Sequence, residues 1–354
     1  MINLPIESEA ILQRRVLLPK EVTLPTSGWP CATDCVHQLS GNAMGTRWCV
    51  QYAAPPLHDA PVVYGQVEEV FGRIVQQMSH WEPSSNLSRF NRASPGTWHA
   101  IPHEFFQVLK KAIQISSLTD GAYDVTIGRW IHAEGFGAKS EDFGALTEMD
   151  PQKADSVSTD GKLGGWARLQ LNSQTESIFQ PGGLALNLSS IAKGYAVDLA
   201  SDCLMSLGLL HHVIELGGEL RGEGVKPNGQ PWWCLVENTT NSESLPQTIV
   251  ALNRLSVATS GDSVHHRAKE DGSRISHLLD PRSSQSASAE VVAVSVFLPS
   301  CMEADAWATA LYILGAEEGI RSANRHRIPV LYTVRNGEGF GQIASEALES
   351  LESD

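Results

Sequence analysis

The segment Leu188–Leu216, LSSIAKGYAVDLASDCLMSLGLLHHVIEL, places a helix directly before a strand. Serine at its start can cap a helix that we expect over residues 190–207. The apolar run at 212–216 then predicts a strand. The two elements follow one another without the regular rhythm of a βαβ repeat.

The same mixture continues outward from this segment. Further strands are expected over 48–52, 232–237, 248–257, 291–297 and 329–334, and further helices over 67–78, 104–117 and 303–314. Irregular alternation of the two element types favours an α+β fold over a doubly wound sheet. The polar stretch 141–165 is either a surface excursion or a weak domain boundary.

The ends of the chain differ from its middle. Four prolines and little periodicity over residues 1–40 predict an extended N-terminal arm on the surface. The main domain is expected over 41–340, and residues 341–354 read as an acidic C-terminal tail.

Composition limits the class of partner. The 354 residues are 42% hydrophobic and carry a formal net charge of −14, which fits a folded enzyme and disfavours nucleic acid. A phosphate-bearing small molecule then needs a bound cation or a helix N-terminus to supply positive charge locally.

Targeting signals and disulfides are not expected. No apolar run is long enough for a signal peptide or an integral membrane segment, so a cytoplasmic location is the expectation. The six cysteines lack paired metal-site spacing and are read as reduced thiols. A bond between Cys31 and Cys35 remains the alternative.

Asp305 and Thr309 lie four residues apart in the expected helix 303–314. This spacing puts a carboxylate and a hydroxyl on one helix face, an oxygen pair suited to Mg²⁺. The alternative is ordinary helix capping and a threonine bonded to a backbone carbonyl.

Lys193 falls in the first turn of the helix expected over 190–207, where its ammonium and the helix N-terminus can both meet a phosphate. Gly194 permits close approach of backbone or ligand. A solvated lysine and a packing glycine are the alternative.

Other candidates follow strands. Two turns can offer backbone N–H groups and hydroxyls to phosphate or ribose oxygens. The first contains Gly217 and Gly218 and is followed by Glu219, and the second contains Thr259, Ser260 and Gly261. Each could equally be a plain hairpin turn. His277 and Asp280 lie close together and either can act as an acid or base, although a structural histidine explains the pattern equally well.

Taken in order, these segments resemble the ApbE family of FAD:protein FMN transferases. The similar motifs are NAMGT at 42–46, SHWEPSSNLSRFN at 79–91, GAYDVTIG at 121–128, LSSIAKGYAVD at 188–198, ELGGEL at 215–220, ATSGD at 258–262, SHLLDPR at 276–282 and EADAWATALYILG at 303–315. Within this resemblance, Asn187, Ser190, Glu219 and Ser263 depart from the residues usual in the family.

The resemblance implies an α+β, T-fold-like flavin transferase that uses Mg²⁺, takes FAD as substrate and releases AMP. FMN would be attached through a phosphoester to a threonine or serine of a flavoprotein with a DxxTGAT-like segment. The metal would be held by Asp305, Thr309 and Ser190; FAD would contact Met44, Trp81, Asp124, Lys193, Gly217, Gly218, Glu219, Thr259, Ser260, Gly261 and His277; and His277, Asp280 and Asp305 would be the catalytic residues. Two other activities remain open, which are FAD hydrolysis to FMN and AMP, and FAD binding without turnover.

Overall fold

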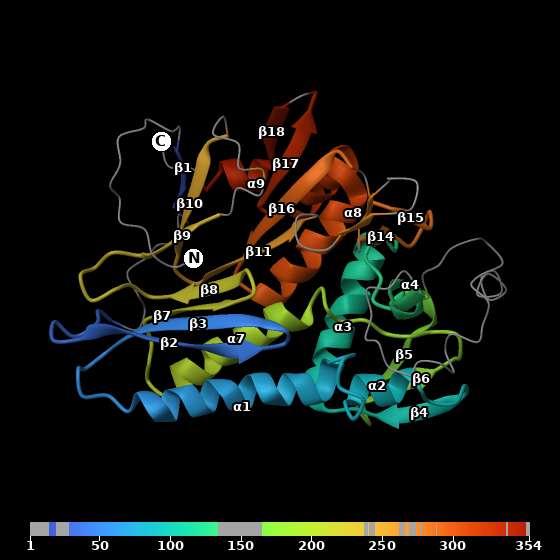
Figure 1. Ribbon diagram of the computed structural model, residues 1–354, viewed down its shortest axis with the longest axis horizontal. Coiled ribbons are helices and arrows are strands. Elements are labelled where there is room, and N and C mark those ends of the chain that lie inside the picture. The colour runs from blue at the N-terminus through green and yellow to red at the C-terminus, as the bar shows by residue number, and fades with distance from the viewer. Residues whose placement is uncertain are drawn as a thin grey trace. The chain divides into compact units, whose positions relative to one another are not determined.

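The computed structural model describes residues 14–18, 28–133, 165–236, 240, 245–261, 266–268, 274–276, 278–287, 289–337 and 339–351. The chain forms two compact units (Figure 1). Unit 1 comprises 1–71, 193–263 and 289–354, and unit 2 comprises 72–192 and 264–288. The candidate at 277 and most of the polar stretch 141–165 lie outside the described residues.

Unit 1 is built on an eight-stranded antiparallel sheet in the order β18-β17-β16-β11-β8-β7-β3-β2. Its strands are β2 (Cys35–Ala43), β3 (Thr46–Ala54), β7 (His212–Leu216), β8 (Glu219–Glu223), β11 (Leu255–Gly261), β16 (Val291–Leu298), β17 (Val330–Asn336) and β18 (Gly339–Ala344). The order joins strands that are far apart in sequence, as when β11 pairs with both β8 and β16.

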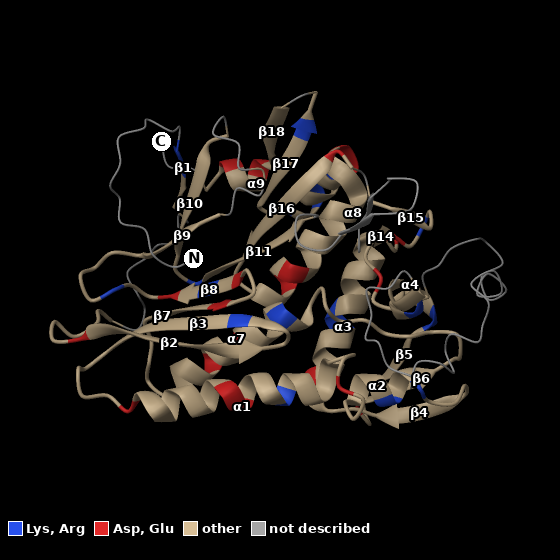
Figure 2. Ribbon diagram, viewed as in Figure 1, with Lys and Arg blue, Asp and Glu red and all other residues tan. Residues whose placement is uncertain are grey.

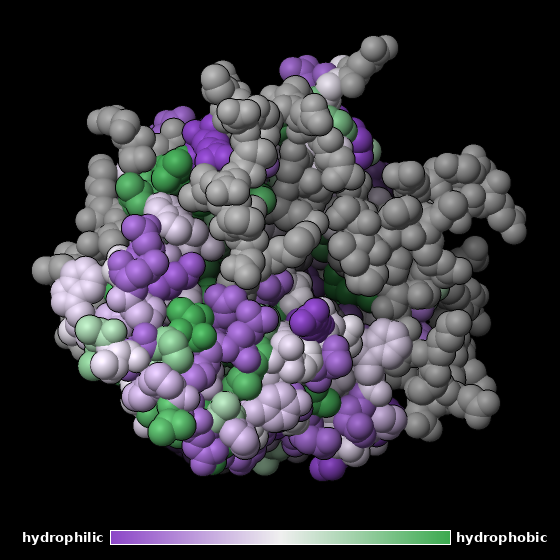
Figure 3. All heavy atoms as spheres, turned by 60° about the vertical axis from the view of Figure 1, so that its left-hand side comes forward, coloured by the Kyte–Doolittle hydropathy of each residue, from purple (hydrophilic) through white to green (hydrophobic). Residues whose placement is uncertain are grey.

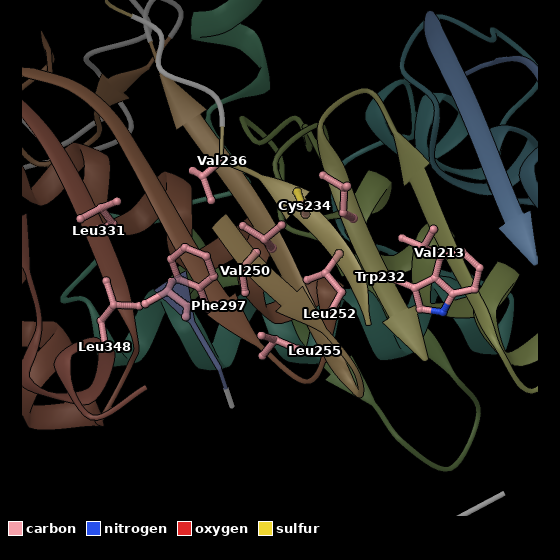
Figure 4. Packing of buried hydrophobic residues seen from close by; sticks show 13 residues of the cluster. Val213, Trp232, Cys234, Val236, Val250, Leu252, Leu255, Phe297, Leu331 and Leu348 are labelled. Atoms are coloured by element: carbon pink, nitrogen blue, oxygen red, sulfur yellow. The ribbon is translucent and has the colours of Figure 1, made fainter. Parts of the chain in front are cut away.

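A smaller sheet in unit 1 has the order β1-β10-β9, with β1 (Arg14–Leu17), β10 (Gln247–Leu252) and β9 (Trp232–Leu235). Apolar residues of both sheets form one buried cluster (Figure 4). Trp232 and Cys234 alternate along β9, and Val250 and Leu252 along β10, as expected for strands that bury one face. The cluster also contains Leu17, which lies within the arm expected from the sequence.

The helices of unit 1 are α7 (Ala192–Ser206), α8 (Cys301–His326) and α9 (Glu346–Glu349). Helix α8 packs on β11, β16 and β17. Gly315 has a non-helical conformation that breaks α8 into two helical segments. The carbonyl of Leu311, one turn before the break, accepts a hydrogen bond from the Tyr332 hydroxyl at 2.7 Å.

Helix α1 (Ala60–Met78) begins in unit 1 and ends in unit 2, and α7 starts at Ala192, the last residue of the segment 72–192 of unit 2. The remaining elements of unit 2 are α2 (Asn86–Asn91), β4 (Thr97–Ala100), α3 (His103–Leu118), α4 (Gly128–Ala133), η3 (Trp166–Arg168), β5 (Gln170–Asn172), β6 (Ser177–Gln180), β12 (His266–Ala268), β13 (Arg274–Ser276), β14 (Leu279–Asp280) and β15 (Gln285–Ser286). The strands pair as a β4-β6-β5 sheet and two hairpins, β12-β13 and β14-β15.

The α+β fold class expected from the sequence is confirmed. One strand expectation is wrong, because 248–257 is not continuous. Arg254 has a positive φ of 54°, which ends β10 and starts β11 in a different sheet. The expected boundary at residue 340 falls inside β18, and α9 follows with Leu348 buried.

No helix in the described part of the chain has the length and apolar character needed to span a membrane. Basic and acidic residues are interspersed over the ribbon (Figure 2), and apolar and polar residues are interspersed on the face seen in Figure 3. All six cysteines are free in the structure.

Candidate functional site

The start of α7 and the start of α8 touch at Gly194. A Cβ atom built on Gly194 would lie 2.3 Å from the Cys301 carbonyl oxygen and 2.8 Å from Cβ of Asp305. No side chain fits at that distance, so glycine is required for the two helices to meet. The contact lets the Gly194 N–H donate to Oδ2 of Asp305 at 3.0 Å.

Asp305 and Thr309 occupy the buried first half of α8, with 4% and 7% of their surfaces exposed. The helix starts at Ser300, whose hydroxyl accepts from the Glu303 N–H. The Thr309 hydroxyl lies 3.0 Å from the Ser260 hydroxyl at the end of β11. The sequence-predicted pair and the predicted turn residue Ser260 therefore lie together in unit 1.

A second hydroxyl pair lies on the opposite face of the sheet, because successive residues of a strand point to opposite faces. The Thr259 hydroxyl lies 2.8 Å from that of Ser295 on β16. The pairing of β11 with β16 sets Thr259 directly opposite Ser295. Ser295 was not predicted from the sequence, where it is one polar residue inside an apolar strand and only the strand pairing reveals its partner.

A buried ion pair lies beside Asp305. Nζ of Lys193 is 2.5 Å from Oε1 of Glu219, which is almost fully buried at the start of β8. Oε2 of Glu219 is buried and has no hydrogen-bond partner within the described structure. The sequence-predicted residues Lys193, Glu219 and Asp305 thus share one charged cluster.

The pKa directions in this cluster follow from burial and charge. Burial raises the pKa of Glu219, although Lys193 opposes the rise and Asp305 adds to it. Burial likewise raises the pKa of Asp305, against Lys193 and the Gly194 N–H. For Lys193, burial favours the neutral amine, but Glu219 and Asp305 outweigh it and raise the pKa. The cluster holds two carboxyl groups against one ammonium, so it attracts further positive charge.

Two tight hairpins end beside each other at the same end of the sheet. Met44 and Gly45 join β2 to β3 with positive φ values of 52° and 76°, and Gly217 and Gly218 join β7 to β8 with φ values of 61° and 101°. Such two-residue turns match the twist of the strands they connect. A Cβ on Gly217 would lie 2.6 Å from the Thr46 side chain, so glycine is needed there for space as well as conformation.

The oxygen donors of unit 1 fit a hard cation. Asp305 supplies a buried carboxylate, Thr309 a hydroxyl, and Glu219 an unpartnered carboxylate oxygen nearby in the charge network. Across the described residues, no group of three His, Cys, Asp or Glu side chains could hold a metal ion by itself. Mg²⁺ accepts one or two protein carboxylates with water or phosphate oxygens, so this donor set suits it better than zinc.

In unit 2, Asp124 organises a turn. Its Oδ1 accepts from the Thr126 N–H at 2.7 Å and hydroxyl at 2.6 Å, and its Oδ2 accepts from the Trp166 N–H at 3.2 Å. Burial raises the pKa of Asp124, and these hydrogen bonds oppose the rise. Trp81, by contrast, is 61% exposed in the loop after α1.

The segment before α7 also belongs to unit 2. Oδ1 of Asn187 accepts from the Ser189 N–H at 2.9 Å, so Asn187, rather than a serine hydroxyl, turns the chain toward the helix. The Ser190 hydroxyl donates to the Tyr123 hydroxyl at 3.2 Å. This leaves the Ser190 carbonyl as the group predicted to reach a metal.

Asp280 lies in β14 and is paired with Arg282. The Arg282 guanidinium contacts both carboxylate oxygens, at 3.0 Å from Nε to Oδ1 and 3.0 Å from Nη2 to Oδ2. The Arg282 N–H also donates to Oδ1 at 2.9 Å. Asp280 is therefore committed to a local ion pair, and His277 remains a prediction outside the described residues.

Comparisons with known proteins identify the family. The family model described as "ApbE family" matches residues 44–332. A Vibrio cholerae serotype O1 protein named FAD:protein FMN transferase is 34% identical over 321 residues, covering 89% of this chain and 92% of that protein. A Haemophilus influenzae protein of the same name is 29% identical over 330 residues, covering 89% and 91%.

Solved structures give the same relationship. The apo crystal structure of the flavinyl transferase ApbE from Pseudomonas stutzeri superposes with a TM-score of 0.76 at 32% identity, covering 90% of this chain and 97% of that one. The flavin transferase ApbE from Vibrio cholerae superposes with a TM-score of 0.75 at 31% identity, covering 89% and 99%. From the motifs in their order, the fold and these matches, the chain belongs to the ApbE family.

Proposed function

We propose that this protein is a Mg²⁺-dependent FAD:protein FMN transferase. It would cleave FAD, release AMP and attach FMN through a phosphoester to a threonine or serine of a flavoprotein with a DxxTGAT-like segment. The observation that carries the proposal is the near full-length similarity to transferases of that name. The buried cluster of Lys193, Glu219, Asp305 and Thr309 supports it, because cleavage of a pyrophosphate needs both anion binding and a cation.

Asp305 and Thr309 would hold the metal through a carboxylate and a hydroxyl oxygen, with the Ser190 carbonyl as a third ligand. When bound, Mg²⁺ would neutralise the pyrophosphate and polarise the phosphorus next to FMN. The Gly194 N–H already orients Oδ2 of Asp305, which lowers the cost of organising the site.

Lys193 and backbone N–H groups would bind the phosphates of FAD. The Lys193 ammonium is held by Glu219, and the helix dipole favours an anion at the start of α7. The Gly217 N–H donates to the Arg47 carbonyl at 3.1 Å, so Gly218, which has a positive φ and no side chain, is the glycine of the pair suited to N–H donation to phosphate oxygens. Thr259, Ser260 and Gly261 would contact the nucleotide from the end of β11.

The flat ring system would be recognised by Met44 and Trp81, whose thioether and indole suit stacking. Met44 is held at the tip of its hairpin with a left-handed backbone. Asp124, whose oxygens order its own turn, would contact the nucleotide through that turn.

In the transfer step, the acceptor hydroxyl oxygen would bond to the FMN phosphorus as the bond to the AMP oxygen breaks. The hydroxyl proton would pass to His277 or Asp280. Because Arg282 holds both oxygens of Asp280, the contacts favour His277 for this role. Phosphoryl-type transition states depend more on positioning than on a strong base, so the base is expected to matter less than the metal.

FAD hydrolysis is the second candidate, since water could replace the acceptor hydroxyl at the same cluster. To separate them, the protein is incubated with FAD and Mg²⁺, with and without an acceptor domain carrying a DxxTGAT segment. Transfer predicts AMP release together with an FMN-sized mass gain on the acceptor. AMP and free FMN without an adduct indicate hydrolysis, and FAD binding without AMP release refutes both.

Two variants sharpen this assay. Asp305→Asn removes the charge that would bind the metal, and we expect it to abolish the mass gain. Glu317→Gln is the matched control, because it removes one negative charge from an exposed position on the same helix. It should transfer FMN at the unaltered rate.

A further inference from the structure

Asp198 lies on α7, one turn beyond Gly194, with its carboxylate directed at the start of α8. Oδ1 accepts from the Cys301 N–H at 2.9 Å, and Oδ2 accepts from the Met302 N–H at 3.0 Å and the Ser300 hydroxyl at 2.8 Å. The Arg221 guanidinium adds an ion pair to Oδ1 at 2.6 Å. Both carboxylate oxygens are thus fully engaged inside the protein.

These contacts provide the capping that α8 needs. The first N–H groups of a helix have no partners within it, and they attract negative charge. The Ser300 hydroxyl accepts a hydrogen bond from the Glu303 N–H, and the Asp198 carboxylate accepts hydrogen bonds from the N–H groups of Cys301 and Met302. The start of α8 is therefore fixed by a residue more than a hundred positions earlier in the chain.

Arg221 links the same carboxylate to the sheet. It lies on β8, two residues after Glu219, and its Nη2 also pairs with Oε1 of Glu223 at 2.9 Å. One carboxylate thus joins α7, α8 and β8. These three elements carry Lys193, Asp305 and Glu219 respectively.

We propose that Asp198 is a positioning residue, which sets α8 against α7 so that Asp305 keeps its place beside the Gly194 N–H. Cys301, which Asp198 holds, lies one turn before Asp305 on the same helix. A displacement of the first turn of α8 also displaces Asp305, because a helix is stiff over so short a distance. The inference rests on the proposed function only in taking Asp305 as a metal ligand.

The test uses Asp198→Asn, whose amide can accept from one of the two N–H groups but no longer carries a charge for Arg221. Mn²⁺ binding to the full-length protein is measured by EPR of the free ion, without FAD or acceptor. Loss of a group that orients a metal ligand commonly weakens metal binding about 10-fold or more, and we expect a change of that size. In turnover, the Mg²⁺ concentration for half-maximal rate should rise more than the rate at saturating Mg²⁺ falls.

Two controls separate positioning from general destabilisation. Glu317→Gln removes one negative charge from an exposed side chain of α8 beyond Gly315 and should leave Mn²⁺ affinity unchanged. Leu348→Ala opens the hydrophobic cluster and should lower the melting temperature without changing Mn²⁺ affinity.

Several results would overturn the inference. The inference is wrong if Asp198→Asn binds Mn²⁺ with an affinity within twofold of wild type, or if Leu348→Ala weakens Mn²⁺ binding as much as Asp198→Asn does. It is also wrong if the wild-type protein binds no Mn²⁺. Failure of the wild type to transfer FMN would instead refute the proposed function, and the Mn²⁺ comparison would still decide the role of Asp198.

Discussion

Replacing Gly194 by alanine tests whether the contact between α7 and α8 is needed for the site. The new Cβ would lie 2.3 Å from the Cys301 carbonyl oxygen, whereas ordinary contacts begin at 3.4 Å. The two helices must therefore separate by about 1 Å at this point. Crowding of this kind costs about 1–3 kcal/mol of folding free energy, partly offset by about 1 kcal/mol for the better helix propensity of alanine.

The effect on activity should exceed the effect on stability. The same displacement moves Asp305 away from the Gly194 N–H that now orients it. Misplacement of a catalytic group by about 1 Å can lower a rate about 100-fold, and we expect Gly194→Ala to lower AMP release by that order. Urea unfolding and AMP release at increasing Mg²⁺ measure the two quantities on one preparation.

Gly65→Ala is the matched control. Gly65 lies on the exposed side of α1, and a Cβ there would meet no atom within 4 Å. Alanine should stabilise this helix by up to about 1 kcal/mol and leave activity unchanged. If Gly194→Ala folds as stably as wild type and releases AMP within twofold of the wild-type rate, the argument from close helix contact is wrong.

Three further outcomes are expected. Thr309→Ala should raise the Mg²⁺ concentration for half-maximal AMP release while Thr309→Ser restores it, and equal Mg²⁺ dependence of the two variants would count against Thr309 as a ligand. Lys193→Met leaves Glu219 as an unpaired buried carboxylate and should lower the free energy of unfolding by about 3 kcal/mol, as measured by urea unfolding. The double variant Lys193→Met with Glu219→Gln should lose less stability than Lys193→Met alone. Burial lowers the pKa of His212 to about 4, and its ring bonds the Leu209 carbonyl and Ser201 hydroxyl as the neutral form. Since the unfolded chain takes up this proton near pH 6.5, the stabilisation is complete above pH 6.5 and up to about 3 kcal/mol is lost as pH falls to about 4. His212→Gln should flatten the stability curve over that range, and an unchanged slope would refute the assignment.

The sequence located much of the fold because several elements have strong local patterns. The strand at His212–Leu216 and the buried helix around Asp305 follow from apolar periodicity. The division between β10 and β11 could not be predicted, because the chain turns at Arg254 with a positive φ and no glycine or proline marks this turn in the sequence. Strand β18 was also missed, since the glycines and polar residues of Gly339–Ala344 resemble a loop until β17 provides a pairing edge.

The candidate site could likewise be predicted only in part from the sequence. The helical spacing of Asp305 and Thr309 is visible in the sequence, and both side chains are buried on α8 in the structure. The pairing of Lys193 with Glu219 was not visible, because it depends on how α7 packs against β8. Asp198 ends the motif at 188–198, but its role was not visible, since its partners lie at the start of a helix about a hundred residues away.

The break at Gly315 divides α8 into a half that is buried throughout and a half that has an exposed face. Residues 304–314 are buried, whereas charged side chains such as Glu317 and Arg321 lie exposed beyond the break. Because the helical hydrogen bonds are interrupted there, a disturbance in the outer half does not pass along a continuous rod to Asp305. Surface labels or charge changes on α8 are therefore best introduced at exposed positions after Gly315, where they are not expected to displace Asp305.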